Sequence, residues 1–500
     1  MSRSGNGGSR VPRPSAEAAF DVIVIGGGVV GCAVLRELAR YDLRLLLLEK
    51  EADLAEGISK ANSGVIHGGF NVPPGSLKAK TNVAGLRKIY GLAADLHVPH
   101  RKTGKLVLAP TDDERPRLEE LKAQGDLNGT PGLEIVDANA ICRLEPLARG
   151  RWALYSPDTG IISPYELTIA LAESAHHNGA RVLLEAPVES VVCHPGIFHL
   201  ATPRGAFSAR WVVNSAGLFA DEVARLAGIS DYAIHPYRGE YLITDKDPGF
   251  SLRMPLYPVP PRDDPGLGIH ITPTMEGNIL LGPSAEAVHE KRDSASTRPV
   301  MDQLKEEAGR LMPELRRLTF IHSYAGLRPK VIDRSGREKF GDFVIEESAV
   351  RPGWLNFIGI ESPGLTASPA IADLVVDMIG AKEELRLKPE FDGGLPERPR
   401  FAALGDGGRA GRVKGNPDWG EMVCRCEYVT RAEVADALRN PFGARSMDAI
   451  KRRTRCGMGR CQGGFCTPRL VEILQDEGVS LERITKRGGG SRLFFGRIKS

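Results

Sequence analysis

Five of the chain's eight cysteines lie close together near its C-terminus. They are Cys424, Cys426, Cys456, Cys461 and Cys466, written as Cys-x-Cys, a gap, and then Cys-x4-Cys-x4-Cys. Core packing does not explain such bunching, and in a reducing compartment clustered thiols bind metals more often than they form disulfides. Zinc sites typically use Cys-x2-Cys pairs, whereas iron–sulfur clusters accept four thiolates of varied spacing. The pattern therefore favours an iron–sulfur site.

A second chemical pattern lies near the N-terminus, where Gly26, Gly28 and Gly31 stand between a buried-strand pattern and a helical pattern. Glu49 ends the next apolar run, 18 positions after Gly31. This spacing is typical of a dinucleotide site, because the glycines allow a tight turn, approach of a pyrophosphate and close helix packing. Glu49 can accept hydrogen bonds from an adenosine ribose, and its charge disfavours the 2′-phosphate of NADP. The alternative is a glycine-rich helix start that binds no ligand.

Positioning these residues requires a strand–helix–strand unit. The apolar run Asp21–Ile25 predicts a buried parallel strand, residues 32–41 a helix, and residues 43–50 a second strand. Residues 71–150 are expected to be mixed and rich in loops, and Ile234–Gly282, rich in prolines, to form an antiparallel sheet. Other strand patterns lie at Arg181–Leu184, Glu189–Val192, Ala209–Asn214 and Trp354–Ile360, the last followed by a helix.

Composition and charge narrow the function classes. With 500 residues, of which 42% are hydrophobic and 26% charged, the chain is too long for one core and ordinary for a globular protein. A net charge of +3 is small for this length and indicates no nucleic-acid partner. The sequence has no run of about 18 apolar residues and no apolar segment of a secretory signal. We therefore expect a cytoplasmic protein with at most peripheral membrane association.

The segment ISKANSGVIHGGFNVPPGSLKAKTNVAG resembles the flavin-facing segment of the D-amino-acid-oxidase-like superfamily. Five further motifs extend the resemblance over about residues 21–380: NSAGLFADEVA, HPYRGEYLI, HITPTMEGNILLGPSAE, AGLRPK and FIGIESPGLTASPAIA. Within the superfamily the chain looks most like FAD-dependent glycerol-3-phosphate dehydrogenases and L-2-hydroxyglutarate dehydrogenases. The resemblance implies a noncovalent FAD. The residues that it places at the cofactor are Gly26, Gly28, Gly31, Glu49, Lys50, Ser59, Asn62, Ser63, Ala216, Gly217, Gly359 and Gly364.

Oxidation of a secondary alcohol needs a base for the hydroxyl proton and a hydride acceptor, and a flavin supplies the acceptor. His67 is our candidate base, because the ordinary pKa of histidine lies near neutrality and the resemblance assigns this role to the matching histidine of glycerol-3-phosphate oxidases. Arg328 is expected to hold an anionic group through two parallel hydrogen bonds, with an interdomain salt bridge as the alternative. We also expect four side chains near the substrate, each with a structural role as its alternative: Arg238, Tyr241, His270 and Ser362.

One departure from the family pattern concerns the substrate. Glycerol-3-phosphate oxidases often carry a phosphate-binding lysine just before the strand that matches GIHITPT. No lysine lies between Arg262 and His270 here, and His270 is the partial replacement that we expect. A 2-hydroxy acid such as L-2-hydroxyglutarate is therefore a rival to glycerol 3-phosphate, and amino-acid oxidation is a further alternative on the same fold.

The segments VCRCEYVT and RRTRCGMGRCQGGFCTPRLVEIL resemble the bacterioferritin-associated-ferredoxin-like [2Fe–2S] module, which also follows the flavin domain of anaerobic glycerol-3-phosphate dehydrogenase. The resemblance leaves Cys456 as an extra thiol and implies four ligands: Cys424, Cys426, Cys461 and Cys466. Between the cysteines, VTRAEVADALRN predicts a helix with Thr430 as N-cap and Glu433 at its third position. Six nearby cations either stabilise a negative cluster or form a solvated face: Arg425, Lys451, Arg452, Arg453, Arg455 and Arg460.

We therefore predict an α/β chain with a Rossmann-like FAD-binding domain, an inserted mixed or antiparallel β substrate domain, and a small helical C-terminal iron–sulfur module. The predicted function is FAD-dependent oxidation of a small anionic secondary alcohol, with electrons leaving through the cluster to a quinone-linked protein or a partner subunit. An alternative of a different class is a binding or sensing protein whose cysteine module holds zinc. The expected bounds are a disordered tail at 1–19, the FAD-binding domain at 20–90, 150–233 and 320–386, the substrate domain at 91–149 and 234–319, a linker at 387–420, the [2Fe–2S] module at 421–480 and a basic tail at 481–500.

Overall fold

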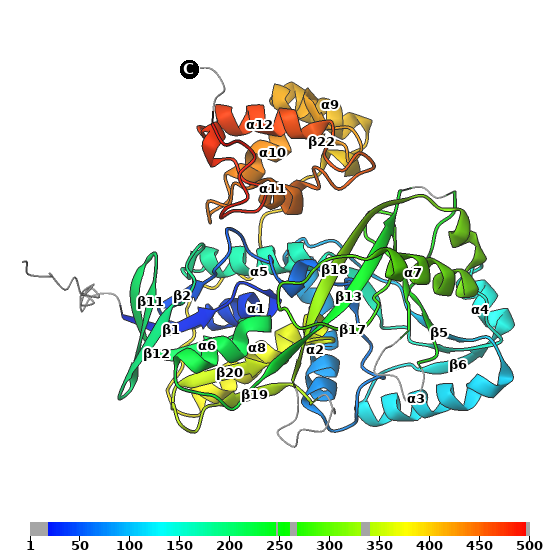
Figure 1. The fold of residues 1–500 in the computed structure, drawn as a ribbon, viewed down its shortest axis with the longest axis horizontal. Helices are drawn as coiled ribbons and strands as arrows, with labels where there is room; N and C mark the ends of the chain where they lie inside the picture. The colour runs from blue at the N-terminus through cyan, green and yellow to red at the C-terminus, as the bar shows by residue number, and fades with distance from the viewer. Residues whose placement is uncertain (1–18, 247–248, 261–267, 332–340, 497–500) are drawn as a thin grey trace, which may run out of the picture.

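The computed structural model describes residues 19–246, 249–260, 268–331 and 341–496. Figure 1 shows a body built on two sheets, with the C-terminal segment, in orange and red, as a small helical unit against one side of it. Ala19 begins the first strand, and the rest of the expected tail 1–19 lies outside the described residues, as do residues 497–500 of the basic tail. None of the helices in the described ranges is long and apolar enough to cross a membrane.

The first sheet carries the glycine-rich turn. Strand β1 (Ala19–Ile25) lies between β2 (Leu45–Leu48) and β12 (Gly205–Asn214) and is parallel to both. The predicted strand–helix–strand unit is confirmed, with helix α1 at Val29–Leu38. The remaining strands of this sheet are β9 (Arg181–Leu183), β10 (Ser190–His194), β11 (Ile197–Thr202), β19 (Val344–Glu347) and β20 (Trp354–Ile358).

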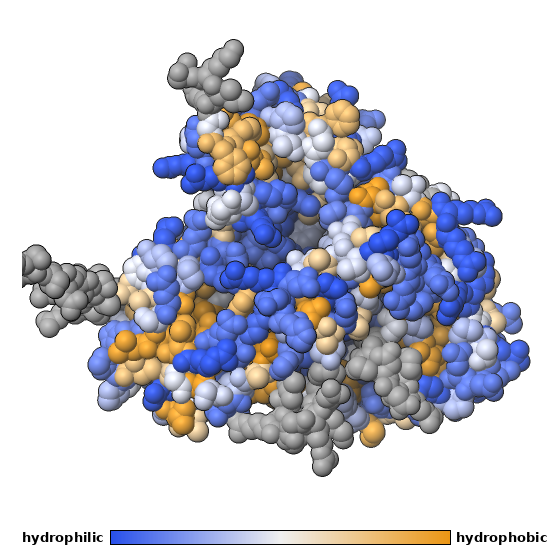
Figure 2. Space-filling view, in the orientation of Figure 1, coloured by the Kyte–Doolittle hydropathy of each residue, from blue (hydrophilic) through white to orange (hydrophobic). Residues whose placement is uncertain are grey.

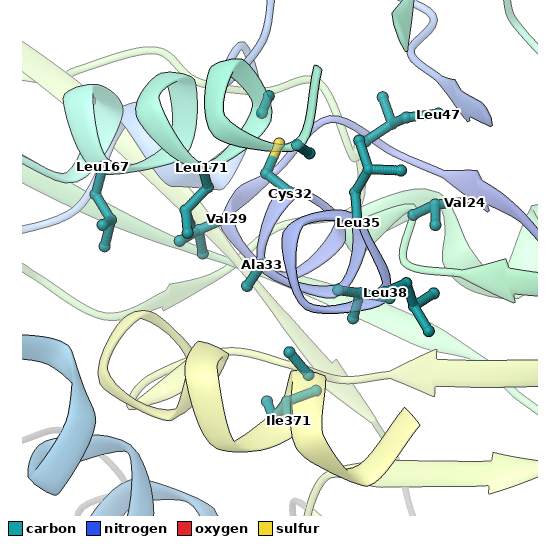
Figure 3. Close-up of a cluster of buried hydrophobic side chains, with 14 of the residues drawn as sticks. Val24, Val29, Cys32, Ala33, Leu35, Leu38, Leu47, Leu167, Leu171 and Ile371 are labelled. Carbon is teal, nitrogen blue, oxygen red and sulfur yellow. The ribbon is translucent and has the colours of Figure 1, made fainter. Parts of the chain in front are cut away.

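Helices cover both faces of this sheet. Side chains alternate along a strand, so Val22 and Val24 pack into the layer of α1, while Ile23 and Ile25 pack toward α6 (Ala220–Leu226). Figure 3 shows helix α1 lying between two others, α5 (Pro164–His177), which carries Leu167 and Leu171, and α8 (Gly364–Gly380), which carries Ile371. This packing fixes the N-terminus of α1, which faces the dinucleotide site.

Residues 71–150 contain more helix than the expected loop-rich region. Helix α2 (Leu77–Asp95) runs for 19 residues from its N-cap Ser76, and α3 (Arg115–Asn128) and α4 (Ala138–Leu144) follow. The apolar pattern of α2 is weak because the helix buries two polar side chains, Thr81 and Asn82, against the rest of the body. It also packs so closely on α8 that a methyl group at Gly85 would lie 2.1 Å from the Thr366 carbonyl oxygen.

The second sheet is mixed, as predicted for the inserted domain. Its longest pair is antiparallel and joins β13 (Ile234–Thr244) to β18 (Phe320–Val331). Helix α7 (Arg298–Leu311) packs on this sheet, and a small sheet of β3 (Val65–Ile66), β4 (His100–Lys102) and β8 (Gly160–Ile162) adjoins it. The other strands of the second sheet are β5 (Leu106–Ala109), β6 (Glu134–Asp137), β7 (Trp152–Tyr155), β14 (Leu256–Pro258), β15 (Ile271–Pro273), β16 (Ile279–Leu281) and β17 (Glu286–Ala287).

Two of these strands depart from the expected domain bounds. We expected β7 and β18 within the FAD-binding ranges 150–233 and 320–386, yet both are hydrogen-bonded into the second sheet. The reason for β18 is its pairing along nearly its whole length with β13, which no local pattern in the sequence reveals.

The C-terminal unit has its own apolar core. It contains a short hairpin of β21 (Met422–Cys424) and β22 (Val429–Thr430) and the helices α10 (Arg431–Leu438), α11 (Met447–Thr454) and α12 (Cys466–Asp476). The predicted capping box is confirmed, because the Thr430 backbone N–H donates to Glu433 Oε2 at 2.8 Å. The expected linker 387–420 includes a helix, α9 (Asp406–Gly415), that the sequence analysis did not anticipate.

Candidate functional site

A cavity of about 1660 Å³ runs from the carboxyl ends of β1 and β2 to the face of the second sheet. Gly31, Arg238 and Gly359 are not among the described residues that line it. The other predicted residues of the body line it together: Gly26, Gly28, Glu49, Lys50, Ser59, Asn62, Ser63, His67, Ala216, Gly217, Tyr241, His270, Arg328, Ser362 and Gly364. Residues from six separated parts of the sequence therefore meet in one cavity.

The glycine-rich turn matches the needs of a bound pyrophosphate. Gly26 has a φ of 109°, and a methyl group there would lie 2.6 Å from the Ser215 carbonyl oxygen. At Gly31 a methyl group would lie 2.1 Å from the Gly26 carbonyl oxygen, so this glycine serves helix packing. Gly28 is the N-cap of α1 and has no side chain of its own to cap that end. The N-terminus of α1 thus faces the cavity and can stabilise an anion.

Glu49 is held in place at the nucleotide end of the cavity. Its Oε2 accepts a hydrogen bond from the Gly27 backbone N–H at 2.6 Å, and its Oε1 accepts one from the Glu51 backbone N–H at 2.8 Å. Burial raises the pKa of the Glu49 carboxyl group, while these two hydrogen bonds oppose that effect. The Nζ of the adjacent Lys50 lies 3.5 Å from the centre of the Phe219 ring.

The segment after β2 forms the next part of the wall. Ser59 Oγ accepts a hydrogen bond from the Val29 backbone N–H at 2.9 Å, so this segment touches the first turn of α1. Asn62 shapes the turn, because its Nδ2 donates to the Ser59 carbonyl oxygen at 2.9 Å and its Oδ1 accepts from the Gly64 N–H at 2.8 Å. Gly359 lies outside the lining, where its φ of 71° and its contact with Val331 account for the glycine.

His67 lies in the wall at the other end of the cavity. Its backbone N–H donates to Thr366 Oγ1 at 2.9 Å, and its Nε2 lies 3.4 Å from Ser362 Oγ. Burial, with a smaller effect of Lys105, lowers the pKa of His67 to about 3. The imidazole is therefore neutral at neutral pH and has a ring nitrogen free to accept a proton.

Lys105 is a residue of the site that the sequence analysis missed. It precedes β5, its side chain is nearly fully buried at 3% residue exposure, and it lines the same cavity as His67. Its Nζ lies 4.4 Å from the Phe70 ring centre and 4.2 Å from the Tyr257 ring centre. Burial lowers its pKa to about 7, and no carboxylate of the described residues pairs with it. The sequence around it, TGKLVLA, is typical of a surface lysine before a strand. Only tertiary packing brings the Lys105 side chain into the interior.

Arg328 lies on β18 near the same end of the cavity. Its Nη2 donates to the Ser284 carbonyl oxygen at 3.3 Å, and no ion pair joins it to a carboxylate in the described ranges. Tyr241 stacks on Tyr324 with ring centres 4.8 Å apart, and burial raises the pKa of Tyr241 to about 12. His270 stacks on Tyr257, and both line the cavity. This end thus offers two cations and several aromatic faces.

Arg238 has a different setting. Its side chain is buried among three carboxylates, with Nη2 2.5 Å from Glu286 Oε2, Nη1 2.9 Å from Asp293 Oδ2 and Nε 3.4 Å from Glu240 Oε1. A guanidinium so surrounded is already neutralised, and the structure does not bring it to the cavity wall. This geometry supports a structural role for Arg238, which was the alternative to substrate binding.

The five clustered cysteines come together in the C-terminal unit. Cys424, Cys456 and Cys466 are buried in its core, and hydrogen bonds from the Cys456 and Cys466 thiols lower the pKa of Cys424. Cys426 and Cys461 are half-buried, with sulfur atoms 3.9 Å apart. Four predicted ligands in two neighbouring pairs fit a cluster of two irons, each of which takes two thiolates. Cys456 is buried beside them, and its expected place as an extra thiol rather than a ligand stays a prediction.

Three arginines of the C-terminal unit, Arg452, Arg453 and Arg455, are buried where the unit meets the body. Arg452 Nη2 lies 2.8 Å from Asp53 Oδ2, and Arg453 Nη1 lies 2.7 Å from the same oxygen. Arg455 pairs with Glu427 of its own unit at 2.8 Å and with Glu276 of the body at 3.3 Å, whereas Arg460 pairs with Asp245 but is 77% exposed. Figure 2 shows a largely hydrophilic surface where the small unit meets the body. For Arg452, Arg453 and Arg455, the interpretation as a solvated face is therefore replaced by that of a docking surface, while Arg460 stays in solvent.

A contact between the thiol cluster and the body lies beside these ion pairs. The Tyr165 hydroxyl of α5 donates to the Met458 sulfur at 3.7 Å and accepts from Arg455 Nη1 at 3.1 Å. On β18, the Tyr324 hydroxyl donates to the Asn62 carbonyl oxygen at 3.1 Å. Side chains thus connect the segment between Cys456 and Cys461 with helix α5 of the body.

Comparison with known proteins agrees with this geometry. Residues 21–378 match the model of the FAD dependent oxidoreductase family, and residues 422–476 match the BFD-like [2Fe-2S] binding domain. The chain is 38% identical over 485 residues to a glycerol 3-phosphate dehydrogenase of Caloramator mitchellensis, covering 96% of this chain and 99% of that one. It is 33% identical to the mitochondrial L-2-hydroxyglutarate dehydrogenase of Caenorhabditis elegans over 71% of this chain and 92% of that one.

A solved structure shows the same body fold. The FAD-bound L-α-glycerophosphate oxidase of Mycoplasma pneumoniae superimposes with a TM-score of 0.70 at 28% identity, covering 76% of this chain and 100% of that one. The predicted fold class, FAD and the [2Fe–2S] cluster are therefore confirmed. The chain belongs to the FAD dependent oxidoreductase family, as an oxidoreductase that binds FAD in its body and a [2Fe–2S] cluster in a C-terminal BFD-like domain.

Proposed function

We propose that this chain oxidises a small anionic secondary alcohol, glycerol 3-phosphate, and passes the electrons out through its C-terminal module. The observation that carries the proposal is the grouping of a neutral histidine, His67, with two cations, Arg328 and Lys105, at one end of the cavity. Within the described residues, no carboxylate pairs with either cation. A phosphate group carries nearly two negative charges at neutral pH, which two cations match. The similarity to a glycerol 3-phosphate dehydrogenase over almost the whole chain supports the same substrate.

The residues take distinct roles in this proposal. Arg328 and Lys105 bind the phosphate and thereby orient the carbinol carbon. His67 accepts the hydroxyl proton, and Ser362 fixes the imidazole through the contact at Nε2. FAD, when bound, supplies the hydride acceptor, and the [2Fe–2S] cluster supplies a one-electron exit. The product is the ketone, since the alcohol loses one hydride from carbon and one proton from oxygen.

Lys105 also offers a replacement for the phosphate-binding lysine that is missing from the family pattern. The lysine expected just before the strand that matches GIHITPT is absent, but Lys105, just before β5, brings a cation to the same cavity. A 2-hydroxy acid with two carboxylates is the second candidate, because the L-2-hydroxyglutarate dehydrogenases are also similar to the body. Anaerobic reduction of the flavin by glycerol 3-phosphate, L-2-hydroxyglutarate, lactate and amino acids decides between them. Bleaching by none of these compounds contradicts the proposal.

The acceptor of the electrons is proposed to be a quinone-linked protein or a partner subunit. An iron–sulfur relay has no use in an enzyme that reduces oxygen directly at the flavin. Reduced thiols are stable in the cytoplasm, which is the location that we propose.

Lys105→Met is expected to lower kcat/KM for glycerol 3-phosphate by about tenfold to a hundredfold, the usual cost of a lost bond to a charged group. Only the ammonium form binds an anion, and burial lowers the pKa of Lys105 to about 7, so KM of the wild type should rise as the pH rises above 7. His67 stays neutral over that range. Steady-state kinetics measured against pH check the loss in the variant and the rise of KM in the wild type. The Lys105→Met variant should show no rise of KM above pH 7. Lys80→Met, exposed on α2, is the control.

Cys466→Ser is expected to remove most of the iron and acid-labile sulfide from the purified protein, since each iron needs two thiolates. Cys456→Ser should keep about two irons per chain, because the four proposed ligands remain. Iron and sulfide analysis of the two variants makes the comparison. Equal iron loss in both would place Cys456 among the ligands, and one zinc with no iron in the wild type would contradict the relay.

A further inference from the structure

The C-terminal tail reaches back to the cavity of the body. Residues Arg487–Ser491, here called the tail loop, line the cavity together with Glu49 and Ser59. The loop is a closed turn, because the Lys486 backbone N–H donates to the Ser491 carbonyl oxygen at 2.8 Å and the Ser491 hydroxyl donates to the Gly488 carbonyl oxygen at 2.6 Å. The basic tail, which the sequence left without a role, thus contributes to the wall of a ligand site.

The tail loop contacts the segment that follows the nucleotide-binding acid. A methyl group at Gly488 would lie 2.1 Å from Ala52 Cβ, and Gly488 has a φ of 87°. Ala52 lies three residues after Glu49, whose carboxylate marks the adenosine end of the site. The tail loop therefore lies over the adenosine end rather than over His67.

A buried ionic contact fixes the module to the same segment. The side chain of Asp53 is 0% exposed and that of Arg452 4% exposed. Arg453 donates to both carboxylate oxygens of Asp53, from Nη1 to Oδ2 at 2.7 Å and from Nη2 to Oδ1 at 2.9 Å. Arg452 also lies 2.5 Å from Glu56, another residue of the cavity wall. Residues 49–60 are thus held between the cavity on one side and the module on the other.

Comparison with the solved oxidase indicates that the wall formed by the tail loop is an addition to the FAD-binding body. The FAD-bound oxidase of Mycoplasma pneumoniae matches 76% of this chain with 100% of its own length, so it binds FAD without a counterpart of the module. In this chain the same cavity has a further wall from the tail loop.

We infer that the iron–sulfur module closes the adenosine end of the FAD site through the tail loop, so that docking of the module and binding of FAD stabilise each other. The physical reason is the shared segment: FAD orders residues 49–60 from within, and the Asp53–Arg452–Arg453 contact orders them from outside. A segment already ordered by one partner costs less to order by the other. The inference rests on FAD binding and not on the identity of the alcohol.

The test uses full-length holoenzyme variants and measures FAD release by the rise in flavin fluorescence after dilution. Gly488→Ala displaces the tail loop by a clash with Ala52, and Arg452→Gln weakens the docking contact without a clash. Each is expected to release FAD about tenfold faster than the wild type, within the ordinary range of coupled sites. The visible spectrum of the cluster confirms that the module is still folded.

Two controls match the two changes. Gly411→Ala adds a methyl group in α9, where nothing lies within 4 Å, and Arg439→Gln removes a cation from an exposed pair with Glu477 on the same module. Both should release FAD at the wild-type rate. The inference is overturned if Gly488→Ala and Arg452→Gln also release FAD at that rate, or if all four variants release it equally fast.

Discussion

Replacing His67 by alanine is expected to slow reduction of the bound flavin by glycerol 3-phosphate by about 10²-fold to 10⁴-fold, the range over which a positioned base acts. The reason is that the hydroxyl proton then has no acceptor, since the neighbouring Ser362 hydroxyl, 3.4 Å from the imidazole, is too weak a base. Anaerobic stopped-flow measurement of flavin bleaching gives the rate. Substrate binding should change little, because Arg328 and Lys105 remain.

The matched control is His177→Ala, which removes an exposed histidine that faces Asp392 and is not part of the cavity lining. It should reduce the flavin at the wild-type rate. A His67→Ala variant with full activity would contradict alcohol oxidation with His67 as base. That result would favour amino-acid oxidation, because a neutral amine needs no strong base.

Asp53→Ala should weaken the attachment of the module to the body by about 3–5 kcal/mol, the cost of leaving buried charges without their partner. Two guanidinium groups, of Arg452 and Arg453, lose their shared carboxylate in a region that water does not reach. Denaturant unfolding followed by the cluster absorbance measures the change. Limited proteolysis in residues 387–420 should also become faster, because this segment then connects two separated units.

Asp476→Ala provides the control for this second prediction. Its carboxylate pairs with Arg431 at 2.8 Å on the surface of the module and is 60% exposed, so its loss should cost less than about 1 kcal/mol. Equal unfolding midpoints for wild type and Asp53→Ala would show that the buried contact does not hold the module.

The pH dependence of this contact has a definite sign. Burial raises the pKa of Asp53, but the Arg453 and Arg452 guanidiniums outweigh it and hold the pKa below its ordinary value. A carboxyl group with a lowered pKa in the folded state stabilises that state above its unfolded pKa, and the contribution disappears as the pH falls. Docking should therefore weaken in acid and stay constant from about pH 5 upward.

Local sequence patterns predicted those elements whose signals span only a few residues. The run Asp21–Ile25, the glycines after it and Glu49 gave the strand–helix–strand unit, because buried parallel strands and helix starts leave short signals. The capping box of Thr430 and Glu433 is equally local. Helix α2 was missed because it buries polar side chains and so lacks a clear apolar stripe.

Long-range pairing accounts for most of what the sequence left open. Arg238 and Arg328 lie on the adjacent, paired strands β13 and β18. Arg238 is neutralised by three carboxylates, whereas Arg328 faces the cavity. Nothing in the two motifs distinguishes them. The same holds for Arg452 and Arg453, whose carboxylate partner lies about 400 positions away in sequence.

The sequence by itself determined the candidate chemistry: a dinucleotide turn, a candidate base, an arginine proposed to bind an anion, and four thiols with the spacing of a [2Fe–2S] module. These are encoded by residue types at short spacings, which the chain carries whatever its final shape. Only the tertiary structure brought Lys105 into the substrate end of the cavity and laid the tail loop over its adenosine end. Burial and charge pairing depend on which distant segments meet, and that is decided by the packing of whole sheets and domains.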